Sequence, residues 1–303
     1  MFTKKLLIWK TLLGVLTLGS VAAAQEGNKY VLDSLEALLA MRTVECDIRI
    51  ETYVDGNEYL ARGRYVEQVL PQTNSTTFLR SMYRLEIKFW NPLLASDASL
   101  NQMTLVCYVS EENQKHLLEQ YTSIEGDNSF RTIDLNKLED CLKETKNEMF
   151  FRQASEVRNL GGLAGMMRQI SRFYDFAQPT QENLQEDEKV STWKLTGTLK
   201  NVHRQNLLTQ FGGLTQNGQY PADFPSDIEI WIDTRNNFPY KIRYLRRSSE
   251  KSDKKKVLLH ESFSNVILNG PSIPTEKFSP LPVPEDVFST QDETEKFIKT
   301  LNL

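Results

Sequence analysis

Cysteine and histidine are scarce in this sequence of 303 residues, which contains three of each. An odd number of cysteines permits at most one internal disulfide and leaves one thiol over. Cys46 and Cys107 alternate with apolar neighbours, so buried thiols are expected, with a disulfide among Cys46, Cys107 and Cys141 as the alternative. There is no CxxC pair, and the histidines lie far apart in the sequence, so no zinc or other metal site is predicted.

Local catalytic motifs are also missing. The sequence has no G-x-S-x-G elbow, His260-Glu261 lacks the second histidine of H-E-x-x-H, and neither glycine pair is followed by G-K-[ST]. The prediction is a protein that is not an enzyme and needs no cofactor. The alternative is a hydrolase whose residues are scattered over the fold, with Ser or Asp next to His203 or His260.

The longest apolar run lies at the N-terminus and is short for a membrane span. Lys4 and Lys5 precede the stretch from Leu6 to Val21, Lys10 lies within it, and three alanines precede Gln25. This arrangement is typical of a cleaved signal peptide over residues 1–24. The alternative is a retained membrane anchor. A cleaved signal predicts a periplasmic or secreted protein that does not span the membrane.

Basic residues do not dominate the composition. The formal net charge is −4, and removal of the three lysines before Ala24 makes it −7, because no acidic residue precedes Glu26. A chain with this charge is poorly suited to phosphate backbones, so nucleic acid is not an expected partner.

A low-complexity linker is missing too, which predicts one domain over residues 25–303. Apolar residues at helical spacing predict helices over 30–41, 135–146 and 160–176, with a short one near 204–211 and a last one over 292–301. Period-two alternation predicts strands at 43–54, 58–70, 79–90, 102–110, 116–124, 190–200, 227–234, 239–248 and 256–268.

The stretch IEIWIDTRNNFPYKIRYL, beginning at Ile228, predicts a β-hairpin. Its apolar side chains alternate on both arms, and Asn236, Asn237 and Pro239 between the arms are residue types that reverse the chain. The fold class predicted from the whole pattern is α+β, a curled antiparallel sheet, or incomplete β-barrel, covered by helices.

Such a sheet has a concave apolar face, and helix 160–176 is the candidate cover. We expect ligand-binding side chains on the face and the cover, namely Leu85, Ile87, Phe89, Trp193, Ile230, Ile232, Ile242 and Tyr244 from strands, and Met166, Met167 and Phe173 from the helix. The alternative is a closed core filled by these same side chains.

The basic run from Arg243 to Lys256 has two interpretations. It is the solvated tip of a hairpin, whose lysines discourage edge pairing, or a surface that meets anionic headgroups.

Several motifs together resemble the outer-membrane lipoprotein-sorting family of the carrier LolA. They are VECDIRIETYVDGNEYLARGRYV, YRLEIKFW, WIDTRNNFP and FSNVILNGPSIPTEKFSP. The resemblance implies an incomplete β-barrel with a helical lid whose cavity receives acyl chains, and it implies a role for Arg84 as the counterpart of a strand arginine. The chain departs from the family in lacking the Arg-Pro-Gly turn and in its middle section, 134–190.

The resulting hypothesis is an exported lipid- or lipoprotein-binding protein that holds acyl chains in a hydrophobic cavity. The alternative is an envelope regulatory or scaffolding module that binds a protein partner through the same fold.

Overall fold

The computed structural model describes residues 26–54, 57–70, 80–90, 101–112, 114–124, 127–137, 140, 162–184, 187–250, 252–283 and 290–296. The predicted signal segment, Cys141 and most of the predicted helix at 135–146 lie outside these residues.

One sheet contains all thirteen strands of the described residues, in the order β13-β6-β5-β4-β3-β2-β1-β12-β11-β10-β9-β7, with β8 paired to β9. All its ladders are antiparallel except β13 on β6. The strands are β1 Thr43–Val54, β2 Asn57–Leu70, β3 Arg80–Trp90, β4 Asn101–Val109, β5 His116–Ile124, β6 Asp127–Asp134, β7 Tyr174–Phe176, β8 Thr180–Leu184, β9 Asp187–Leu199, β10 Asp227–Asp233, β11 Pro239–Arg247, β12 Lys255–Leu268 and β13 Thr290–Asp292.

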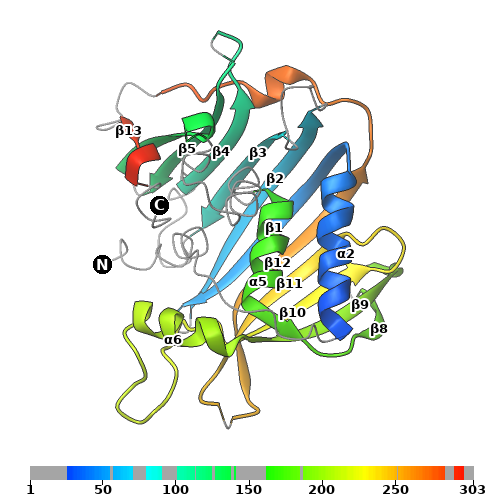
Figure 1. Cartoon of the computed structure of the whole chain (residues 1–303), viewed down its shortest axis with the longest axis vertical. Helices are drawn as coiled ribbons and strands as arrows, with labels where there is room; N and C mark the ends of the chain where they lie inside the picture. The colour runs from blue at the N-terminus through cyan, green and yellow to red at the C-terminus, as the bar shows by residue number, and fades with distance from the viewer. Residues whose placement is uncertain are drawn as a thin grey trace.

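Two helices lie side by side across one face of this sheet, in front of β1 and β10 to β12 (Figure 1). They are α2, Glu26–Ala40, and α5, Leu163–Phe173. We call the face that they cover the inner face. Helix α6, Asn201–Gln210, follows β9, and the short η2, Thr275–Phe278, lies in the C-terminal segment. The predicted α+β class, with a large antiparallel sheet and helical cover, is confirmed.

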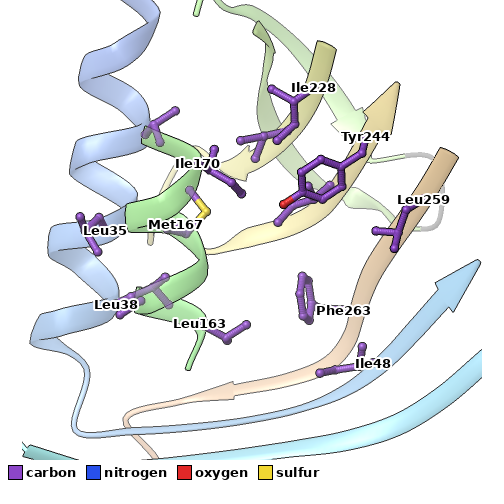
Figure 2. Close-up of a cluster of buried hydrophobic side chains, with 14 of the residues drawn as sticks. Leu35, Leu38, Ile48, Leu163, Met167, Ile170, Ile228, Tyr244, Leu259 and Phe263 are labelled. Atoms are coloured by element: carbon purple, nitrogen blue, oxygen red, sulfur yellow. The ribbon is translucent and has the colours of Figure 1, made fainter. Parts of the chain in front are cut away.

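The main core forms between the two helices and the inner face. Leu35 and Leu38 of α2 and Met167 and Ile170 of α5 point at strand residues such as Ile228 (Figure 2). This is the arrangement expected of amphipathic helices, which bury one apolar stripe each.

A smaller core lies on the opposite, outer face. Ile273, Phe278 and Leu281 of the C-terminal segment pack there against Val66 and Val106. The chain therefore covers part of both faces, although the sheet has helices α2 and α5 on only one of them.

The predicted hairpin is β10 and β11. Asp233 Oδ1 accepts hydrogen bonds from the backbone N–H groups of Arg235 (2.6 Å) and Asn236 (3.3 Å), and Asn237 has a φ of 58°. Asparagine tolerates this left-handed conformation better than most residues, which is why these side chains form the turn.

Four strands were not predicted, namely β6, β7, β8 and β13. Three of them have five residues or fewer, and β6 reads DNSFRTID, which is mostly polar. Their backbone groups pair with neighbours, a contribution that side-chain periodicity does not record. Asp292, predicted to begin a helix, ends β13 instead; its carboxylate accepts the N–H of Thr294 (2.9 Å), where the helical turn starts.

Candidate ligand-binding face

The predicted strand residues of the site share one face of the sheet. Cross-strand pairing joins Ile230 to Ile242 and to Leu195, and Ile232 to Trp193. Leu85, Ile87 and Phe89 alternate along β3 and pair with Tyr65, Gly63 and Ala61 of β2. Because paired residues point to the same side of a sheet, all of these side chains lie on the inner face.

The predicted helix residues meet the sheet from α5. Met167 is completely buried, whereas Met166 and Phe173 are half-buried and pack against the same core. The helix brings them over β10 to β12, several strands away from β3 (Figure 1). The predicted site residues therefore fall into two groups, one beneath α5 and one on β3.

Arg84 belongs to neither group. It alternates with Tyr83 and Leu85 and so lies on the outer face, where its Nε is 2.6 Å from Glu86 Oε1. The strand period of two fixes this outcome, since a residue next to an inward-facing leucine must point outward. The role that the family resemblance implied for Arg84 has no counterpart on the inner face.

Four strand residues of the group beneath the helices are tightly packed, whereas Trp193 is half-buried. Ile230, Ile232 and Ile242 have no exposed surface, and Tyr244 is 5 % exposed. Around these four residues the face is a closed core, which was the alternative to a cavity.

The group on β3 adjoins surface that is only partly covered. Ala61, Phe89, Met103 and Leu105 are half-buried and pack at the border of the main core. Register places Ala61 beside Phe89, Ile87 beside Met103 and Leu85 beside Leu105, so these side chains are contiguous on the inner face. We call Ala61, Phe89, Met103 and Leu105 the inner patch.

Helix α5 is attached to the inner face by a buried hydroxyl. Tyr65 Oη donates to Glu67 Oε2 (2.6 Å) and accepts the backbone N–H of Leu163 at the start of the helix (3.2 Å). Burial raises the pKa of Glu67, while its hydrogen bonds from Tyr65 and Ser81 act in the opposite direction. At the other end of the helix, Lys200 Nζ donates to the carbonyl of Ser171 (2.8 Å).

A second carboxyl group on the inner face, Glu261 of β12, has no such partners among the described residues. It pairs in register with Ile50 on one side and Ile242 on the other. Its strand neighbours Leu259 and Phe263 point towards the helices (Figure 2), and Glu261 between them shares their side of the strand. Burial alone raises the pKa of this carboxyl to about 7.

Sequence reasoning missed Glu261, although a signal was present. In LLHESFSNV, Leu259 and Phe263 occupy the apolar positions of an alternating strand, and Glu261 occupies the position between them. An acidic residue at an apolar position of a strand calls for an explanation, because an unpaired buried charge is costly.

Comparison with known proteins gives similarities of fold. No family model and no curated protein matches the sequence. Solved structures that the chain resembles include a DUF1329 family protein from Desulfovibrio piger (13% identity, TM-score 0.35, 84% of this chain and 95% of that one). Two more are the Mycobacterium tuberculosis lipoprotein LppX (12%, 0.33, 82% and 97%) and a LolA superfamily protein from Nitrosomonas europaea (11%, 0.22, 82% and 97%).

A structure of the LolA superfamily is thus among those that the chain resembles. With TM-scores below 0.5, such likenesses carry no argument about function.

One cysteine and one histidine lie together, and these residue types can act as a nucleophile and its general base. Cys107 Sγ lies 3.1 Å from His116 Nε2, and both side chains are buried. Burial raises the pKa of the Cys107 thiol far above its ordinary value, which favours the protonated thiol over the nucleophilic thiolate. Cys46 and Cys107 are both free and buried, as predicted.

At His260, one of the two histidines named for the hydrolase alternative, the described partner is a glutamate and not a serine or an aspartate. His260 Nδ1 lies 3.1 Å from Glu51 Oε2, and its Nε2 has no hydrogen-bond partner in the part of the chain that the structure describes. Within the same residues, no group of three or more His, Cys, Asp or Glu is placed to hold a metal ion. Nor is any helix of the described residues long and apolar enough to cross a membrane.

Proposed function

We propose that this chain is an exported protein that binds the acyl chains of lipids or lipoproteins on its inner face. The observation that carries the proposal is the inner patch, four contiguous apolar side chains that remain half-buried while the neighbouring face beneath α5 is closed. Contiguous apolar surface of this kind marks a binding site more often than isolated apolar residues do.

The energetics of the patch suit an acyl chain. Each methylene group that leaves water for an apolar surface contributes about 0.8 kcal/mol, so a long chain binds without any covalent step. Phe89 and Met103 offer a flat ring and an adaptable thioether, which accommodate chains of different lengths. Ala61, between Ile50 and Phe89 in the ladder, leaves room above the sheet for a guest.

Export is proposed from the sequence of residues 1–24, with its basic start, apolar centre and alanine-rich end. Mass spectrometry of the protein purified from its own cells tests this directly. Export with cleavage predicts a mature N-terminus at Gln25, and an intact N-terminus at Met1 contradicts it.

Acyl binding is tested by native mass spectrometry of the purified protein and by titration with a fluorescent fatty acid after delipidation. Met103→Asp, which places a charge in the inner patch, is expected to abolish uptake. Thr104→Asp is the matched control, because Thr104 is the next residue on the same strand and points to the outer face. Thermal melting confirms that both variants fold.

The proposal is supported if the original protein takes up fatty acid, the Met103→Asp variant does not, and the Thr104→Asp variant still does. Absence of bound lipid together with absence of fatty acid uptake overturns it. In that case, a stoichiometric protein partner recovered with the delipidated chain would favour the regulatory or scaffolding role instead.

A further inference from the structure

Glu261 lies deep in the molecule and still has surface that solvent can reach. It lies far enough inside the molecule for burial to raise the pKa of its carboxyl to about 7, and yet the side chain is half-buried instead of fully enclosed. Because part of this residue keeps accessible surface, solvent reaches it. A polar group of a ligand that arrives from the same side can therefore reach it as well.

No counterion for Glu261 is described on the neighbouring strands. Over the register from Leu259 to Phe263, the two strands on either side present only uncharged side chains to the inner face: Ile228, Ile230, Ile232, Ile242, Tyr244, Ile48, Ile50, Thr52, Tyr59, Ala61 and Gly63. By contrast Glu67, the other acid described on this part of the face, is held by Tyr65 and Ser81. Of these two carboxyl groups, Glu261 is the one without a hydrogen-bond or ion-pair partner among the described residues.

A straight row of paired residues connects Glu261 to the inner patch. Glu261 pairs with Ile50, Ile50 with Ala61, and Ala61 with Phe89. Phe89 is three strands away from Glu261, which corresponds to about 14 Å at the usual spacing of strands. An extended acyl chain is long enough to span this distance, with one end at Phe89 and the other at Glu261. Ile50, between them, is 4 % exposed, so the protein atoms that cover it have to move aside for the chain to lie there.

We propose that Glu261 binds the polar end of the bound amphiphile, and that this polar end is a protonated amine. The inference rests on the proposed function, because the apolar part of the ligand lies on the inner patch. A carboxylate in apolar surroundings forms a strong charge-assisted hydrogen bond with an ammonium group, which supplies the missing counterion. An anionic head would instead meet a group of its own charge with no cation described nearby.

The experiment compares three ligands that share one chain length, namely dodecylamine, dodecanol and dodecanoic acid, by calorimetric titration. Concentrations stay below the micelle concentrations of the amine and the acid and below the solubility limit of the alcohol. At pH 8 dodecylamine is protonated and Glu261 is ionised for the most part. The proteins compared are the original chain, Glu261→Gln, which keeps the shape of the side chain, and Glu86→Gln. Glu86→Gln is the matched control, because it is the same substitution at a residue on the outer face.

We expect dodecylamine to bind about tenfold or more tightly than dodecanol, the scale of one hydrogen bond to a charged group. Glu261→Gln should remove this preference and leave dodecanol binding unchanged, while Glu86→Gln should retain the preference. Equal affinities for the amine, the alcohol and the acid would overturn the role of Glu261 but preserve the proposed acyl binding. Absence of binding by all three ligands would overturn both proposals.

Discussion

At the scale of single residues, the two carboxyl groups of the inner face differ in how their burial is compensated. Glu67 accepts hydrogen bonds from hydroxyl groups, and one of these hydroxyls also accepts the first N–H of helix α5. Glu261 has only apolar neighbours in its row, and its carboxyl is neutral over a wider range of pH than an exposed glutamate. A buried carboxyl group that destabilises the fold when it ionises is found more often at a functional site than elsewhere.

The raised pKa of Glu261 makes stability depend on pH in a defined direction. Between the ordinary value of 4.5 and about 7, the folded chain holds a proton that the unfolded chain has released, so stability falls as pH rises through this range. Glu261→Gln removes this loss. We expect the variant to be more stable than the original chain at pH 8, by up to about 3 kcal/mol, and to differ little from it at pH 4.

Urea denaturation at the two pH values measures this difference. Glu86→Gln, on the outer face, is expected to show no comparable gain at pH 8. A Glu261→Gln variant whose stability difference is the same at both pH values would contradict the pKa shift.

At the scale of elements, helix α5 joins two environments. Met167 lies on its fully buried side, and Met166, the next residue, is half-buried at the border of the core. Helical periodicity turns adjacent residues by about 100°, so the two methionines cannot share one environment. The tyrosine hydroxyl at the start of the helix and the lysine near its end hold this orientation over the sheet.

The two methionines therefore serve as a matched pair for alanine substitution. Met167→Ala is expected to lower the free energy of unfolding by about 2–5 kcal/mol, because it leaves a cavity in a closed core. Met166→Ala should cost clearly less, since less of its side chain is removed from water. Chemical denaturation of both variants measures the contrast, and equal losses would show that the helix is not seated as described.

Most helices and strands could be predicted from the sequence because each is long enough to show the spacing of apolar residues that is typical of its kind. Strands β1, β2, β5, β10 and β11 and helices α2 and α5 have long stretches with one clear period, and their expected positions agree with the structure to within a few residues. Strands β7, β8 and β13 are too short to show a period. Element length thus decided which parts of the sheet could be predicted.

At the scale of the whole molecule, apolar groups gather on both faces of the sheet. The main core joins α2 and α5 to the inner face, and the smaller core joins the C-terminal segment to the outer face of β2 to β6. The sheet separates the two, so a change in the smaller core should affect stability without reaching the inner patch.

Phe278 tests this separation, because its ring is 2 % exposed in the smaller core. Phe278→Ala is expected to lower the free energy of unfolding by about 3–5 kcal/mol. Its affinity for a fluorescent fatty acid, measured under conditions where the variant is folded, should remain that of the original chain. A loss of affinity comparable to that of Met103→Asp would show that the two faces are coupled.

The sequence by itself determined the fold class, the faces of the long strands and the apolar character of the inner face, because alternation and helical spacing are local properties of the chain. Only the tertiary structure decided which of the predicted site residues remain partly open, since burial depends on what packs above each strand. It also placed Arg84 on the outer face and Glu261 among apolar neighbours that come from segments some 200 residues away in the chain. Those contacts depend on register between distant strands, which periodicity within one strand does not specify.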